Sequence, residues 1–171
     1  PVSFFENGYI QQGTICLDKY YKYKEGYTIL LKGGFPVSYD INGFIRQGRL
    51  VGDSELECRK NYYIKFSSDT EIAFHDTGYV SKGTLKNNTV VYYLPNSALE
   101  FQYGTVVEFF DDGFLRSGTL YGDQHIKTLV FKDRTPVSFY PGGTIHKGTL
   151  RYEAILKGLN GEMKSVETGS T

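Results

Sequence analysis

The chain has 171 residues, with 19 acidic and 19 basic side chains and a formal net charge of zero. This balance lacks the basic footprint that binding to nucleic acid or to an anionic membrane requires, so no nucleic-acid partner is expected. No apolar run approaches the roughly 20 residues needed to cross a bilayer, which predicts no transmembrane segment.

One sequence pattern occurs five times, which indicates one supersecondary unit stacked on its neighbours. We predict an all-β fold of tandem antiparallel β-hairpin repeats of about 35 residues, stacked into an extended or solenoid-like sheet. Closure into a five-repeat propeller or a barrel is the alternative, because closure removes exposed sheet edges. The copies fill residues 1–150 and read PVSFFENGYIQQGTI from Pro1, PVSYDINGFIRQGRL from Pro36, EIAFHDTGYVSKGTL from Glu71, VVEFFDDGFLRSGTL from Val106 and PVSFYPGGTIHKGTL from Pro136.

Each copy predicts a hairpin with one bulge. An aliphatic residue stands two positions before an aromatic one, which places both on one face of a strand. The glycine four residues after the aromatic predicts a turn with positive φ, at Gly8, Gly43, Gly78, Gly113 and Gly143. A second glycine inside the next strand is typical of a bulge or of the close approach of another backbone, at Gly13, Gly48, Gly83, Gly118 and Gly148.

The segments between these hairpins predict one or two further strands per copy, and the fourth copy is five residues shorter there. A carboxylate or amide recurs five residues after the second glycine, at Asp18, Asp53, Asn88 and Asp123. A lone carboxylate per copy falls short of the 6–8 oxygen ligands of calcium, so we interpret these residues as loop caps and expect no metal site. Residues 151–171 match the pattern poorly. We expect a C-terminal cap to about Met163 and a loose end after it, with a final irregular strand or a disordered end as alternatives.

Nothing in the pattern predicts catalysis, so we expect no enzyme and no cofactor. Asp111 and Asp112 resemble paired carboxylates, but they occupy turn positions. The histidines stand at unrelated offsets or in a linker, at His75, His125 and His146. Cys16 and Cys58 also stand at non-equivalent offsets, so we expect neither to be part of the repeat. We expect free, partly buried thiols, although a disulfide between them stays open.

Eight tyrosines in the linking segments are the candidate ligand or partner surface, because tyrosine offers an apolar ring and a polar tip. They are Tyr20, Tyr21, Tyr23, Tyr27, Tyr62, Tyr63, Tyr92 and Tyr93. We expect about half of them to cover the sheet instead of facing a partner. A ligand-binding protein would place them in equally spaced pockets, whereas a scaffold would spread them over a flat face.

The spacing of aromatic, glycine, aliphatic and glycine in the five copies resembles bacterial tandem hairpin repeats of the MORN type, and more distantly the cell-wall-binding, choline-binding and toxin carbohydrate-binding hairpins. The first resemblance implies an extended scaffold or docking surface, and the second implies ligands held between hairpins. The chain has no Trp, so Tyr rings would replace the Trp faces that hold a quaternary ammonium in a choline site.

We therefore expect a non-catalytic interaction or structural scaffold module of a bacterial envelope or secreted protein. A carbohydrate or cell-wall binding module with aromatic pockets between copies is the alternative. The partner is accordingly a protein or a glycan, and an edge-to-edge homo-oligomer is plausible for an open sheet. Because the chain begins at Pro1 inside a complete copy, we expect a processed or cloned fragment of a longer protein, and a cytoplasmic location stays open.

Overall fold

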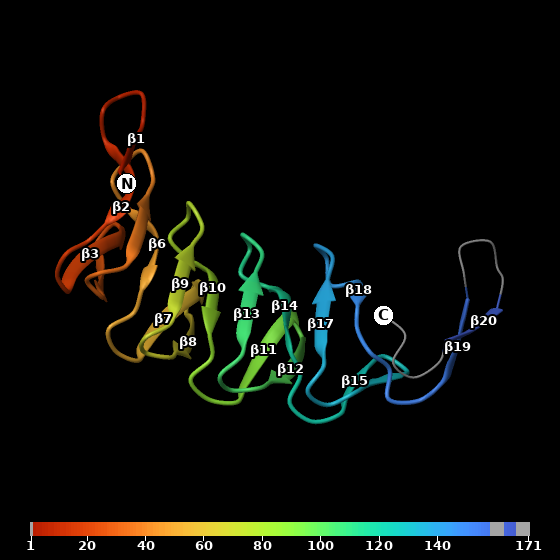
Figure 1. Ribbon diagram of the computed structural model, residues 1–171. Helices are drawn as coiled ribbons and strands as arrows, with labels where there is room; N and C mark the ends of the chain where they lie inside the picture. The colour runs from red at the N-terminus through yellow and green to blue at the C-terminus, as the bar shows by residue number, and fades with distance from the viewer. Residues whose placement is uncertain (1, 158–162, 167–171) are drawn as a thin grey trace.

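A computed structural model describes residues 2–157 and 163–166 of the chain. These residues form strands and turns, with no helix among them, so the all-β prediction is confirmed. Figure 1 shows the copies following one another from the red N-terminal end to the blue C-terminal end, with the tips of their hairpins on the same side. The array stays open, and the alternative of a closed propeller or barrel is wrong.

Five hairpins, one from each copy, form a ten-stranded antiparallel sheet in which each copy pairs with the next. Its strands are β1 (Ser3–Phe4), β2 (Ile10–Thr14), β5 (Pro36–Tyr39), β6 (Ile45–Arg49), β9 (Glu71–Phe74), β10 (Val80–Thr84), β13 (Val106–Phe109), β14 (Leu115–Thr119), β17 (Pro136–Phe139) and β18 (Ile145–Lys147). The five turn glycines have φ values between 77° and 84°, as predicted.

A second, two-stranded hairpin follows in each copy and is called here the accessory hairpin. The accessory hairpins are β3 (Lys19–Lys24) with β4 (Tyr27–Leu31), β7 (Ser54–Arg59) with β8 (Tyr62–Phe66), β11 (Thr89–Leu94) with β12 (Ser97–Phe101), β15 (Gln124–Ile126) with β16 (Leu129–Phe131), and β19 (Ala154–Lys157) with β20 (Met163–Val166). Each copy thus contains four strands, and the five residues missing from the fourth copy shorten its accessory hairpin, as expected.

The tail contains the fifth accessory hairpin. Ala154 pairs with Val166 in β19 and β20, as Lys19 pairs with Leu31 in β3 and β4. β20 includes Ser165 and Val166, so these two residues do not belong to a loose end. Residues 167–171, where the rest of that end was expected, lie outside the described residues.

Apolar side chains from both layers fill the space between the sheet and the accessory hairpins. Leu31, Phe66, Phe101 and Phe131 end the second strand of four accessory hairpins, and their exposed fractions are 0–3%. Each forms an isolated β-bridge with the next copy, to Leu50, Leu85, Leu120 and Leu150. The accessory hairpin of one copy therefore covers the sheet hairpin of the following copy.

The second glycine of the pattern makes this cover possible. A Cβ built on Gly83 would lie 2.5 Å from Phe66 Cδ1, and one on Gly118 would lie 2.6 Å from Phe101 Cδ1. The close approach that the second glycine predicts is thus made by a side chain of the accessory hairpin, not by another backbone. The predicted bulge is present, but it falls two residues earlier, where the register shifts at Ser81 between Val80 and Lys82.

Gly83→Ala is expected to destabilise the protein by about 1–3 kcal/mol, because the added methyl group overpacks the contact with Phe66. Gly13→Ala is the matched control at the same offset in the first copy, where the nearest atom to a built Cβ is Val2 Cγ2 at 3.7 Å. Urea unfolding of both variants at low protein concentration measures the difference. Equal loss of stability in the two variants would contradict the cover contact.

Candidate functional site

The outer face of the ten-stranded sheet carries an unbroken row of side chains, called here the outer row. The strand register brings one residue of each strand opposite the next. Most of these residues are polar and none is a large apolar residue; they are Ser3, Gln12, Ser38, Gln47, Ala73, Lys82, Glu108, Ser117, Ser138 and Lys147. Because neighbouring strands lie about 4.8 Å apart, equivalent positions return roughly every 10 Å.

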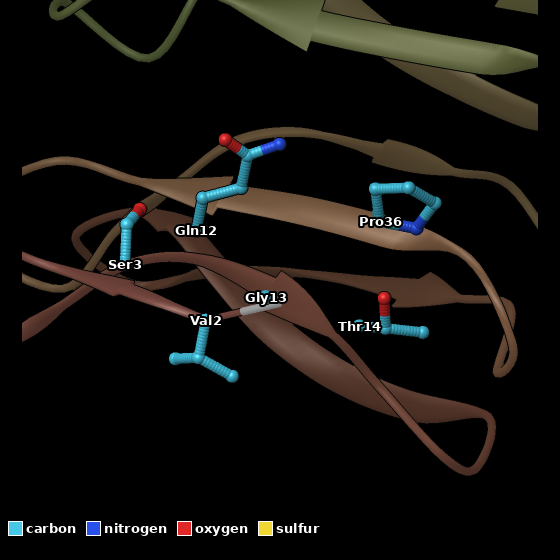
Figure 2. Close-up of a pocket in the computed structure, with 6 residues that line it drawn as sticks. All are labelled: Val2, Ser3, Gln12, Gly13, Thr14 and Pro36. Carbon is cyan, nitrogen blue, oxygen red and sulfur yellow. The ribbon is translucent and has the colours of Figure 1, made fainter.

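Shallow hollows recur beside the outer row at equivalent positions of copies 1, 2 and 5. The first, of about 350 Å³, is shown in Figure 2 and is lined by Val2, Ser3, Gln12, Gly13, Thr14 and Pro36. Figure 2 shows the side chains of Ser3 and Gln12 pointing to the same side, whereas Val2 points to the opposite side. The hollow of copy 2 has about 320 Å³ and that of copy 5 about 180 Å³.

All eight candidate tyrosines lie in the accessory hairpins, on the other layer of the molecule. Tyr20, Tyr27 and Tyr63 are exposed, whereas Tyr23 is only 5% exposed and belongs to the core. The remaining four are partly buried: Tyr21, Tyr62, Tyr92 and Tyr93. None of the eight lines any of the three hollows beside the outer row.

Two of these tyrosines connect copies that are not adjacent in the chain. The ring of Tyr23 in copy 1 stacks on Phe74 of copy 3, and the ring of Tyr93 in copy 3 stacks on Phe139 of copy 5, each with centroids 4.6 Å apart. Cys58 stands 35 residues from both tyrosines and is fully buried at the same place in copy 2. The statement that its offset is unrelated to the repeat was therefore wrong.

The residue that follows Tyr23, Cys58 or Tyr93 in the sequence lies against the turn of the sheet hairpin two copies later. Arg59 Cζ lies 4.6 Å from the ring centroid of Phe114, and Lys24 Nζ lies 5.2 Å from that of Tyr79. Both are cation–π contacts. In the third such pair, Leu94 replaces the cation and Thr144 replaces the aromatic ring. The copy that lacks the cation thus also lacks the aromatic ring that the cation would contact, although the two positions are 50 residues apart in the sequence.

Glu57 joins two accessory hairpins through a partly buried ion pair with Lys24. Burial would raise the pKa of Glu57, but the Lys24 ammonium and the backbone N–H of Asn61, 2.8 Å from Oε1, outweigh it and lower the pKa. Burial raises the pKa of Tyr23 to about 12, and the charge of Glu57 adds to the shift. Both groups therefore keep their ordinary protonation states at neutral pH.

The cysteines do not form a disulfide. Both are free, as expected, but Cys16 is exposed and Cys58 is fully buried, so neither is the partly buried thiol that the sequence predicted. Burial raises the pKa of Cys58, which disfavours the reactive thiolate.

Polar contacts also join successive hairpin turns. Arg46 at the bulge of copy 2 forms a partly buried ion pair with Asp40 and donates a hydrogen bond to the carbonyl of His75, 2.9 Å away in copy 3. His75 continues the chain of contacts into copy 4, where Nδ1 lies 2.6 Å from Asp111 Oδ1 and Nε2 lies 3.1 Å from the Phe109 carbonyl. Asp111 thus joins two turns, whereas its neighbour Asp112 has the expected local role and accepts from the N–H of Phe114 at 3.0 Å.

The recurring Asp and Asn residues act as loop caps, as predicted. Each accepts a backbone hydrogen bond of 2.7–2.9 Å from the loop that follows the accessory hairpin, and the donors are Gly33, Ser68, Tyr103 and Asp133. Donor and acceptor are 15 residues apart in three copies and 10 apart in the shortened fourth copy.

The described residues hold no group of three or more His, Cys, Asp or Glu side chains that could bind a metal ion. The same part of the chain has no helix long and apolar enough to cross a membrane. No protein-family model, no curated protein and no solved structure matches the chain. The MORN-type resemblance therefore rests on the motif alone.

Asp53→Asn is expected to reduce the loss of stability in acid. The N–H of Ser68 and the Lys86 ammonium hold the pKa of Asp53 below its ordinary value. A carboxyl whose folded-state pKa is lowered stabilises the protein above its unfolded-state pKa, about 4, and this stability disappears as the pH falls through the folded-state value. Urea unfolding at a series of pH values from 6 down to about 2 measures the effect.

The Asn variant should keep the cap, because Asn88 accepts the same hydrogen bond in copy 3. Its free energy of unfolding should therefore vary less with pH in the acid range. Parallel pH profiles for the two proteins would show that the charge of Asp53 contributes nothing.

Proposed function

We propose that the chain is a non-catalytic interaction or structural scaffold module, of the kind that the MORN-type resemblance implies for a bacterial envelope or secreted protein. The observation that supports this function best is the outer row, which offers one continuous, mostly polar and repeated surface across ten strands. Half of its side chains are small, at Ser3, Ser38, Ala73, Ser117 and Ser138, and the other half are long polar or charged side chains that can reach a protein partner. Several shallow hollows along it provide repeated contacts in place of one deep ligand pocket.

Carbohydrate or cell-wall binding through tyrosine pockets is the weaker of the two candidates. It has less support because the hollows lie beside the outer row, whereas the tyrosines lie in the accessory layer. Two of those tyrosines, Tyr23 and Tyr93, use one ring face to stack on Phe74 and Phe139. A stacked ring face is not free to hold a sugar.

The double variant Ser38→Arg and Ser117→Arg is expected to abolish partner binding, because two long cationic side chains would fill two places where the outer row has small ones. Both serines point away from the core, so the stability should change by only about 0.5 kcal/mol. The matched control is Tyr20→Ser with Tyr63→Ser, which changes two exposed residues of the accessory layer.

Binding of the three proteins is measured on bacterial envelope proteins and, separately, on protein-free cell-wall fragments and a glycan array. Retention on envelope proteins that is lost only in the serine double variant supports the proposal. Saturable binding to glycan that is lost only in the tyrosine variant would replace it with the carbohydrate function.

A further inference from the structure

Two residues beside the sheet hairpin of copy 2 break the repeat. Arg49 follows the second glycine of this hairpin, and Phe35 stands directly before its first strand. Threonine takes the first position in the other four copies and the second position in copies 3 to 5, at Thr14, Thr84, Thr119 and Thr149 and at Thr70, Thr105 and Thr135. Arg49 Cζ lies 4.4 Å from the ring centroid of Phe35, in a cation–π contact. Two departures from the repeat thus meet in space.

The fold does not require the ring of Phe35. The threonines before copies 3 to 5 each donate a hydrogen bond from Oγ1 to a carbonyl of the preceding loop, at 2.6–2.7 Å. A phenyl ring has no such donor, so the loop before copy 2 lacks a bond that the three later loops have. The ring is only partly buried. This loop therefore has an aromatic ring at the surface in place of a local hydrogen bond.

Arg49 is held in one orientation. Its Nε donates to Asp69 Oδ1 at 2.9 Å, and the same oxygen accepts from Lys32 Nζ at 2.7 Å. These contacts leave both Nη atoms of Arg49 without a hydrogen bond or an ion pair among the described residues. A guanidinium held in this way offers N–H groups that match the two oxygens of a carboxylate.

Glu71 stands directly opposite Arg49, on the neighbouring strand β9. Opposite charges at such positions stabilise a sheet when they pair, but Arg49 pairs with Asp69 instead. The Glu71 side chain is exposed and forms no ion pair or hydrogen bond in the described part of the chain. A free carboxylate and a guanidinium with free donors therefore lie on adjacent strands.

Both residues line the hollow of copy 2, of about 320 Å³. Gln12 and Gln47 line it as well, and an amide side chain can both donate to and accept from a peptide group. Phe35 and Pro36 form its apolar part. The hollow adjoins the one in Figure 2, with which it shares Gln12 and Pro36.

The hollow of copy 2 lies inside the sheet, away from both sheet edges. The strands that contribute to it are β2, β5, β6 and β9. On their two outer sides they pair with β1 and β10. Its walls therefore consist of residues that the structure describes, whatever precedes or follows the array.

We propose that the hollow of copy 2 binds an extended segment of a protein partner, in which an acidic and a basic residue are separated by one residue. The acidic side chain pairs with the Nη atoms of Arg49 and the basic one with Glu71, while the main chain of the segment bonds to Gln12 and Gln47. Alternate residues of an extended chain lie on one face about 6.6–6.8 Å apart, which suits two charges on neighbouring strands. The inference rests on the proposed function, whose partner it describes.

The charges of the hollow favour this occupant over others. Glu71 would repel a polyanion, and Arg49 would repel a polycation. A neutral glycan would take water from both charges without pairing either, which costs free energy. A segment with both signs pairs each charge, and such complementarity gives specificity.

An array of synthetic peptides tests the charge pattern. The peptides carry one Glu and one Lys in a host of Thr and Val, either adjacent or separated by one, two or three residues. Peptides with only one of the charges, or with none, are the controls. The unchanged protein should bind the peptides with one intervening residue about tenfold more tightly than the controls. Binding that ignores the charge pattern, or no binding to any peptide, would overturn the proposal.

Glu71→Lys separates a binding role from a structural one. Because the Glu71 side chain is exposed, this variant should unfold at the temperature of the unchanged protein. Its preference should move to peptides with two Glu separated by one residue, since both charges of the hollow are then positive. A variant that keeps the preference of the unchanged protein would contradict the pairing with Glu71.

Phe35→Thr and Arg49→Thr restore the residues of the other copies, and thermal unfolding establishes that both variants fold. Each should raise the Kd for the preferred peptides about tenfold to a hundredfold. The matched control is Arg116→Thr, which removes an exposed arginine of β14 with the same change in net charge. Equal Kd values for Arg49→Thr and Arg116→Thr would show that only the net charge matters and would overturn the proposal.

Binding of bacterial envelope proteins distinguishes this proposal from the proposed function. The proposed function fails if the unchanged protein binds none of them. This proposal alone fails if they bind equally to the unchanged protein and to Arg49→Thr. Saturable binding to a glycan that is lost in Arg49→Thr would also overturn it.

Discussion

The structure depends on one contact between layers, in which an apolar side chain lies directly over a glycine of the next copy. Without the Phe66 ring above Gly83, the sheet would be a single layer with one apolar face in water. A two-stranded hairpin alone is at best marginally stable in water, so the accessory hairpins depend on the sheet, and the sheet depends on them to cover its apolar face. The glycine is thus fixed by the space above it, whereas the turn glycines are fixed by their positive φ.

The accessory hairpins extend this dependence beyond nearest neighbours. The chain covers copy 2 with the hairpin of copy 1 and then reaches copy 3 through the stacking of Tyr23 on Phe74. Ion pairs and cation–π contacts of Lys24 and Arg59 lie along the same route. Simple repeat arrays are described by interactions between adjacent units. In this protein the stability of one copy also depends on the copy two positions away, so unfolding is more cooperative than such a description gives.

Much of the fold follows from the sequence, because turn chemistry and period-two alternation are local signals. The turn glycines, the loop caps and the shortened fourth copy were predicted from residue offsets alone. The second layer was not predicted, because the sequence pattern of a strand is the same whether the strand joins the sheet or forms a hairpin that folds back over the next copy. Cys58 was missed for a similar reason. It stands 35 residues after Tyr23 and is buried at the same place, but a cysteine and a tyrosine do not look like equivalent residues in the sequence. The contact of His75 with Asp111 joins turns of different copies, and no spacing within one copy indicates it. The outer row could be found only once the strand register was known.

The overlaps between copies also set how the array bends. Some contacts join copies that are two positions apart: copy 1 with copy 3, copy 2 with copy 4, and copy 3 with copy 5. The first two of these contacts span the junction between copies 2 and 3, and the last two span the junction between copies 3 and 4. Only one crosses each outer junction, from the described contacts of Tyr23 and Tyr93. Because more of these contacts span the central junctions, we expect the middle of the molecule to bend less easily than its two ends. A load applied along the array would therefore be carried by the central copies, while the end copies adjust their angle to whatever they contact.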